Sequence, residues 1–185
     1  MATILAIAAH PDDETMLAGG TLAMYAAQGH AVSILLTTRG EGGEAGEPPL
    51  ADVEQLGAYR EREVRAAAAA LGARQVLFLP YVDPRMEIGG IASRIDVPLE
   101  EFVAAIAGHL RQLRPEIVLT HGSDGEYGHP QHIYTNQATR LALALVQQRC
   151  TLLTWNAWYA GAWRPRMLNP SDRADIIRDI TPWLE

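Results

Sequence analysis

Short apolar runs alternate with stretches of helical spacing along most of the chain. The apolar runs are typical of strands buried on both faces of a sheet, and they cover residues 3–9, 31–38, 75–80, 116–120 and 152–159. Apolar side chains at helical spacing predict helices over residues 13–28, 52–71, 99–113 and 132–148. A late strand is predicted at residues 175–180. Alternating strands and helices favour an α/β fold of three layers, with a mostly parallel sheet between helices.

Length and charge restrict the kinds of protein that this chain can be. Its 185 residues suit one domain, taken as residues 1–185. The formal net charge is -7 without any basic block, so we expect no nucleic-acid partner. All 15 basic residues are arginine, which excludes a Schiff-base lysine and a P-loop lysine. Cys150 is the one cysteine, which excludes an internal disulfide and a cysteine-based zinc cluster.

The start of the chain and its apolar runs lack the patterns of membrane targeting. Met1 is followed by Ala-Thr-Ile rather than by basic residues and a long apolar run, so no signal peptide is predicted. No apolar run approaches the roughly 18 residues of a membrane span. We therefore expect a soluble protein of the cytoplasm.

Polar residues gather in the loops that follow the first, second and fourth predicted strands. These loops are residues 10–14, 38–43 and 121–132, and they hold four of the six histidines. Because ligands of open α/β sheets bind at the carboxyl ends of strands, we expect the functional site there. Residues 40–45 fit the dinucleotide fingerprint G-x-G-x-x-A, but they follow the second strand and their glutamates would repel a pyrophosphate. Dinucleotide binding is therefore not expected.

Two pairs of potential metal ligands have the same spacing. His10 and Asp13 are three residues apart at a strand-to-helix junction, and His129 and His132 repeat that spacing at the start of another helix. Two imidazoles and one carboxylate with an open position make a catalytic zinc site. A further carboxylate and histidine would supply the base and acid of metal-assisted hydrolysis. Two alternatives stay open, because the same ligands bind iron(II) in oxygenases and carboxylates at residues 12–14 also suit a helix N-terminus.

Four stretches of the chain resemble the motifs of one family. Ala-His-Pro-Asp-Asp-Glu at residues 9–14 resembles the signature of the LmbE-like, or PIG-L, family of zinc-dependent N-acetyl-sugar deacetylases. Gly-His-Pro-Gln-His at residues 128–132 resembles the His-Pro-Asp-His stretch of that family. Residues 38–41 and 60–63 resemble two weaker motifs. The similarity runs from residue 3 to about residue 140.

The resemblance implies a fold, a cofactor and catalytic roles. It implies a three-layer Rossmann-like fold with a mostly parallel sheet, and a Zn²⁺ ion held by His10, Asp13 and His132. Asp12 would be the general base. His129 would stabilise the oxyanion or protonate the departing amine.

The resemblance also bears on the substrate. The family removes acetyl groups from N-acetylglucosamine units of inositol conjugates, thiol precursors and chitin fragments, and some members cleave other amides of thiol-sugar conjugates. Arg60 and Asp83 would contact hydroxyls of a small amino-sugar substrate, and Tyr127 or Trp158 are candidates to stack on a sugar ring. The identity of the conjugate and the oligomeric state, a homo-oligomer included, stay open.

Two departures from the family pattern alter these expectations. Gln131 stands where the family usually has Asp, and a neutral amide favours protonated His129 less than a carboxylate does. We therefore expect His129 to lose its acid form at lower pH than in members with Asp. The chain also ends without the C-terminal helix that family members usually add. A catalytically inactive sugar-binding module is thus an alternative of a different class.

Overall fold

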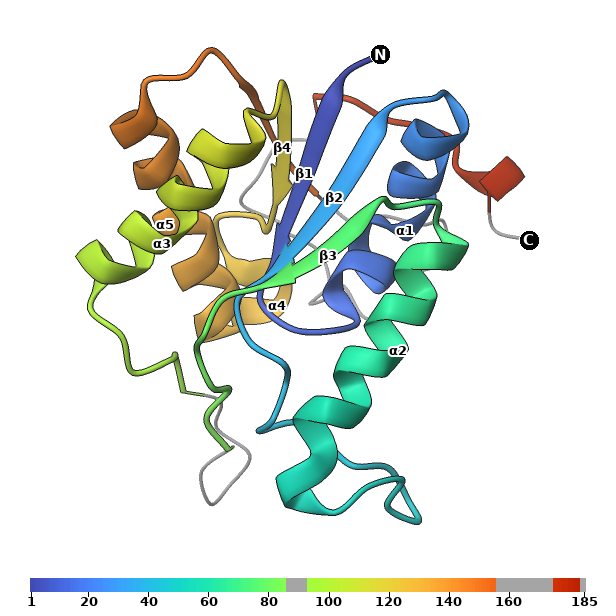
Figure 1. Ribbon diagram of the computed structural model, residues 1–185, viewed down its shortest axis with the longest axis vertical. Coiled ribbons are helices and arrows are strands. Elements are labelled where there is room, and N and C mark those ends of the chain that lie inside the picture. The colour runs from blue at the N-terminus through green and yellow to red at the C-terminus, as the bar shows by residue number, and fades with distance from the viewer. Residues whose placement is uncertain (86–92, 156–174, 184–185) are drawn as a thin grey trace.

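Five parallel strands form one sheet in the computed structural model, which describes residues 1–85, 93–155 and 175–183 (Figure 1). In chain order these strands are β1 (Thr3–Ala8), β2 (Ala31–Leu36), β3 (Gln75–Phe78), β4 (Ile117–Thr120) and β5 (Thr151–Thr154). Their order across the sheet is β3-β2-β1-β4-β5. Each strand overlaps a run predicted from the sequence, so the expected parallel sheet is confirmed.

Helices cover both faces of this sheet, as the alternating pattern predicted (Figure 1). The longer helices are α1 (Asp13–Ala27), α2 (Leu56–Ala70), α3 (Leu99–Leu113) and α5 (Pro130–Val146). Ala6 of β1 packs into a core with α1 and α2, whereas its neighbour Ile7 packs into the core with α3 and α5. Strand β1 is apolar throughout because it supplies both cores. None of the described helices is both long and apolar enough to cross a membrane.

An aromatic cluster fixes α5 against α3, and the start of α5 holds His132, with His129 as its N-cap. Phe102 of α3 stacks on Tyr134 of α5 with ring centroids 5.2 Å apart. The rings of Tyr81 and Phe102 pack in a T-shaped arrangement with centroids 5.6 Å apart. The Tyr134 hydroxyl donates to the Val97 carbonyl at 2.7 Å, so its polar end is satisfied. The first turns of α5 are therefore held rigidly near the sheet.

The strand order reverses between β1 and β4. From β1 the chain proceeds through β2 to β3 on one side, whereas β4 and β5 lie on the other side. Loops that leave neighbouring strands in opposite directions open a crevice at their carboxyl ends, where open α/β sheets bind ligands. The loops after β1, β2 and β4 meet at this edge.

Several boundaries differ from the prediction. The helix predicted at 52–71 is divided into a short 3₁₀ turn, η1 (Val53–Gln55), and α2. The helix predicted at 132–148 begins two residues earlier, because Pro130 lacks an N–H and suits the first helical turn. The preceding loop contains a short helix that was not predicted, α4 (Gly125–Gly128).

The prediction of a late strand at residues 175–180 is wrong. These residues have no regular structure and lead into a 3₁₀ turn, η3 (Thr181–Trp183). The Ile180 side chain lies against α1, where a Cβ on Gly20 would come within 2.6 Å of it. The apolar residues Ile176 and Ile177 are exposed, so they add to no core. Residues 156–159 of the fifth predicted strand, Trp158 included, lie outside the described residues.

Candidate metal centre and substrate pocket

The loop between β1 and α1 places two polar side chains at the carboxyl edge of the sheet. Asp13 is the first residue of α1, and its buried Oδ2 accepts a hydrogen bond from the His10 backbone N–H at 2.8 Å. The same oxygen lies 3.3 Å from His10 Nδ1. The three-residue spacing thus puts both side chains on one side of the junction.

The start of α5 brings two histidines to the same place from a distant part of the chain. His129 is the N-cap of α5, and its Nδ1 accepts a hydrogen bond from the Gln131 backbone N–H at 3.3 Å. A neutral His129 ring therefore carries its proton on Nε2. His132 is buried, with Nε2 3.3 Å from Asp13 Oδ1, and its ring centroid lies 5.4 Å from that of His10.

A buried glutamate in α4, which sequence analysis did not single out, anchors two of the histidines. Glu126 Oε2 lies 2.6 Å from His132 Nδ1 and 2.9 Å from His121 Nδ1. Its Oε1 accepts a hydrogen bond from the Gly122 backbone N–H at 2.9 Å. A carboxylate behind the second ring nitrogen is the usual support of a metal-binding histidine. Glu126 stands in a polar loop of the sequence, but the backbone φ of 63° that turns it inward leaves no mark in residue spacing.

Among the residues that the structure describes, two overlapping groups of potential metal ligands have ligand atoms within 4.8 Å of one another: His10, His129 and His132, and Asp13, His121 and His132. The shared His132 has a buried Nε2 without a hydrogen-bond partner in the described chain. His121 is occupied on both ring nitrogens, because its Nε2 accepts from the Ala9 backbone N–H at 3.0 Å. The buried Nε2 of His132 faces the Asp13 carboxylate, and the His10 imidazole lies beside that carboxylate. Two imidazoles and one carboxylate are a donor set that fits a divalent transition-metal ion.

The buried charges of this centre shift one another's ionisation. Burial opposes the charge on Asp13, but the neighbouring His132 and His10 hold the pKa of that carboxyl well below its usual value. Burial likewise opposes protonation of His132, yet Asp13 and Glu126 raise its pKa to about 9. In contrast, burial and the adjacent His132 and His10 lower the pKa of His129 to about 3.

Asp12 lies at the rim of the centre and is tied to helix α2. Its Oδ2 accepts a hydrogen bond from Arg60 Nη2 at 2.7 Å, and the same Nη2 donates to the Pro11 carbonyl at 2.5 Å. Partial desolvation and the Asp13 carboxylate raise the pKa of Asp12, and Arg60 opposes the shift. Asp12 makes no side-chain cap to α1, although it occupies the N-cap position. The capping alternative therefore does not describe its carboxylate.

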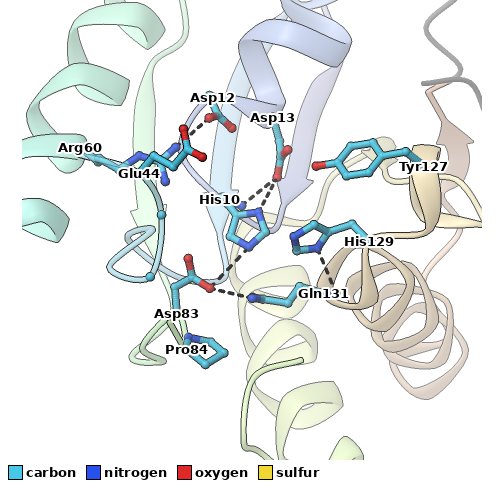
Figure 2. A pocket seen from close by; sticks show the side chains of 12 residues that line it. His10, Asp12, Asp13, Glu44, Arg60, Asp83, Pro84, Tyr127, His129 and Gln131 are labelled. Carbon is cyan, nitrogen blue, oxygen red and sulfur yellow. Dashed lines mark hydrogen bonds and ion pairs between the residues drawn. The ribbon is translucent and has the colours of Figure 1, made fainter. Parts of the chain in front are cut away.

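These residues line one pocket at the carboxyl edge, together with side chains from the loops after β2 and β3 (Figure 2). The sequence-predicted residues that line it are His10, Asp12, Asp13, Arg60, Asp83 and His129, and His132 lies buried beside them. Tyr127 also lines it and places its ring edge 5.8 Å from His129. Glu41 accepts from the Asp83 backbone N–H at 3.0 Å, so it joins the two loops.

The side chain of Gln131 does not contact the His129 ring. Its Nε2 donates to Asp83 Oδ1 at 2.6 Å, and only its backbone N–H reaches His129. The expected effect of this residue on the acid form of His129 stays a prediction.

The family model described as PIG-L, GlcNAc-PI de-N-acetylase, matches residues 5–143. The chain belongs to the PIG-L family. The matched range contains most of β1, all of β2, β3 and β4, the loops that hold His10, His129 and His132, and every residue that lines the pocket. The resemblance noted in the sequence is therefore confirmed.

Several known proteins are similar to this chain in sequence or in fold. A deacetylase of 1D-myo-inositol 2-acetamido-2-deoxy-alpha-D-glucopyranoside from Rhodococcus erythropolis is 37% identical over an alignment of 153 residues, and the match covers 76% of this chain and 52% of that protein. The N,N'-diacetylchitobiose deacetylase of Pyrococcus horikoshii matches with a TM-score of 0.66 at 25% identity, over 78% of this chain and 50% of that one. A 4-carboxy-2-hydroxymuconate hydratase of Pseudomonas putida matches with a TM-score of 0.62 at 26% identity, over 80% and 57%. The chain thus spans about half the length of these proteins.

Proposed function

We propose that this protein is a zinc-dependent hydrolase that removes the N-acetyl group from an N-acetylglucosamine-type sugar or its conjugate. The observation that carries the proposal is the convergence of Asp13 and His132, with their ligand atoms 3.3 Å apart and Glu126 behind the histidine. A buried histidine with a carboxylate behind it is typical of metal-binding sites, which supports the proposal. The deacetylase relatives supply the reaction type that this arrangement would serve.

His10, Asp13 and His132 would hold the ion. When bound, zinc makes water a nucleophile near neutral pH and polarises a carbonyl group. The same set of two imidazoles and one carboxylate also suits iron(II), but a second carboxylate and a neutral imidazole beside them favour hydrolysis. Asp12 and His129 would provide these two groups, since both line the pocket.

Asp12 would act as the base. It accepts a proton from the attacking water as the new C–O bond forms at the acetamide carbon. Arg60 holds Asp12 Oδ2 at 2.7 Å, which fixes the carboxylate while its other oxygen receives the proton. The proton then passes to the amine nitrogen as the C–N bond breaks, which leaves acetate and the free amino sugar.

His129 would stabilise the developing oxyanion. Because its Nδ1 accepts from the Gln131 backbone, its Nε2–H is the donor available to the carbonyl oxygen. The position at the N-terminus of α5 also favours a neutral ring over a charged one. One such donor contributes roughly 10²–10³ in kcat. Of the two roles expected for His129, the hydrogen bond supports the oxyanion role.

The pocket favours a neutral substrate rich in hydroxyl groups. Its carboxylates belong to Asp12, Asp13, Glu44 and Asp83. Carboxylates accept hydrogen bonds from sugar hydroxyls and repel anions. The hydratase neighbour makes water addition to an unsaturated acid a second candidate, but a carboxylated substrate would meet this repulsion. An amide of a thiol-sugar conjugate is compatible with the same chemistry.

Acetate release tests the proposal directly. Zinc-loaded protein should release acetate from the N-acetylglucosamine–inositol conjugate or from diacetylchitobiose, and a chelator should stop it. Asp12→Asn should remove most of this activity while the zinc content stays the same, and Asp52→Asn, on an exposed loop, serves as the matched control. Absence of acetate from the loaded protein with every N-acetyl sugar would contradict the proposal and favour the inactive binding module.

A further inference from the structure

Gln131 and Asp83 form a buried contact in the wall of the pocket (Figure 2). Gln131 is 3% exposed and Asp83 is 6% exposed. The Gln131 Nε2 donates to Asp83 Oδ1 at 2.6 Å, which is a short bond to a charged acceptor. Asp83 Oδ1 also lies 3.7 Å from His10 Nε2, so the contact adjoins the metal centre.

The chemistry of the two groups fixes how each is oriented. A carboxylate only accepts, so the amide must present Nε2 to it. The other end of the amide, Oε1, is buried without a hydrogen-bond partner in the described chain, which indicates that the bond to Asp83 sets the rotamer. The Asp83 backbone is held independently by Glu41 at 3.0 Å. With Oδ1 occupied, Asp83 Oδ2 makes no hydrogen bond to the described residues and is left for a ligand.

We propose that Gln131 is a positioning residue that fixes the Asp83 carboxylate so that its Oδ2 accepts a hydrogen bond from one ring hydroxyl of the sugar. This inference rests on the proposed function and names a determinant of its specificity. The backbone of the same residue donates to His129, so residue 131 connects the hydroxyl contact with the group at the reacting carbonyl. The family's usual Asp at this position could not donate from its side chain to Asp83 while ionised.

An exchange of donor and acceptor tests the inference. Asp83→Asn keeps the bond from Gln131 but turns an N–H toward the sugar, and Gln131→Glu sets two carboxylates against each other. Each should lower kcat/KM for acetate release from the N-acetylglucosamine–inositol conjugate by about tenfold or more. In the double variant the new amide at position 83 donates to the new carboxylate at position 131, and its oxygen again faces the sugar. The double variant should therefore be more active than either single variant.

Activity on deoxy sugars distinguishes the proposed role of Gln131 from a purely structural one. Wild-type protein should discriminate against the one deoxy analogue that lacks the contacted hydroxyl, and Gln131→Met should lose this discrimination. Gln148→Met is the matched control, since its Nε2 makes a comparable bond to the Pro115 carbonyl far from the pocket. The inference would be overturned if the double variant lost kcat/KM by the product of the two single losses. Unchanged discrimination between the sugar and its deoxy analogue in Gln131→Met would overturn it as well. Wild-type protein without acetate release would instead contradict the proposed function.

Discussion

Asp12 has a backbone conformation that side-chain-bearing residues rarely adopt, with φ 108° and ψ -34°. Its carbonyl accepts from the N–H groups of Thr15 and Met16, so helix α1 itself holds the residue there. Strain of this kind persists where the surrounding structure imposes it, and it gathers at functional sites. At Asp12 it aims a carboxylate toward the rim of the pocket.

Asp12→Gly and Asp12→Ala separate this strain from the loss of the carboxylate. Both variants lose the base and the contact with Arg60, so both should lose acetate release. Glycine adopts a positive φ without strain, whereas alanine does not. The unfolding free energy of Asp12→Gly should therefore exceed that of Asp12→Ala by about 1–3 kcal/mol. Urea unfolding of the two variants measures the difference. Equal stabilities would show that the backbone at position 12 is not strained.

Residue spacing predicted one part of the site better than the other. The pairs His10–Asp13 and His129–His132 were found because the members of each pair are three residues apart beside the start of a helix. Glu126 was missed because its role depends on an irregular turn, and its partners come from two different elements. The bond from Gln131 to Asp83 joins the first turn of α5 to the loop after β3, and no local pattern encodes such a contact.

At the scale of elements, α4 supports the histidines of the candidate metal centre. Glu126 accepts from the Gly122 backbone and contacts both His121 and His132 through one oxygen. An amide at this position cannot accept on both atoms, so one contact would face an N–H instead.

Glu126→Gln should therefore weaken zinc binding by about 10–100-fold. Competition with a chromophoric chelator measures the affinity. Glu116→Gln is the matched control, because that glutamate also accepts a backbone N–H but lies exposed at the opposite end of the sheet. Unchanged zinc affinity in Glu126→Gln would remove Glu126 from the account of the centre.

Helix α2 is fixed to the end of β2 by a small charge network. Glu61 accepts from Arg39 Nε at 2.7 Å and from Arg65 Nη2 at 2.7 Å. Both guanidinium groups also lie over the Phe78 ring, at 4.7 and 5.5 Å from its centroid. Hydrogen bonds from Arg39 and then Arg65 lower the pKa of Glu61.

Glu61→Gln should lower the unfolding free energy by about 1 kcal/mol at pH 7. A lowered pKa in the folded state gives stability that is present above the ordinary pKa of about 4.3 and lost as pH falls through the folded value. The difference between wild type and variant should therefore shrink below about pH 4. Urea unfolding at pH 7 and below about pH 4 measures this difference in stability. Glu63→Gln, on the exposed side of α2, is the control. A difference that grows with acid would contradict this sign.

Elements buried on both sides were the easiest to predict. Strand β1 is an unbroken apolar run because every residue after Thr3 is buried. Residues 175–180 carry a similar apolar pair at 176 and 177, but those side chains are exposed and the segment lies along α1. Composition alone does not distinguish such a segment from a strand, because the distinction depends on which surface it meets.

At the scale of the whole molecule, the strand order creates the site. The sequence predicted parallel strands but not their order, because buried apolar runs of this kind carry no mark of their neighbours. The order β3-β2-β1-β4-β5 places β1 beside β4, and so brings the first loop of the chain to the start of α5. The N,N'-diacetylchitobiose deacetylase of Pyrococcus horikoshii resembles this fold over 78% of the chain, with a TM-score of 0.66.

The central claim is that this arrangement lets two distant loops bind one divalent ion. Anomalous diffraction at the zinc edge, from crystals of zinc-loaded protein, tests it most directly. The account predicts a single zinc position at about 2.0–2.2 Å from His10, Asp13 and His132, with His129 and Asp12 beside it but not bound. A zinc position on His129 or His121 in place of these ligands, or no bound zinc, would contradict it.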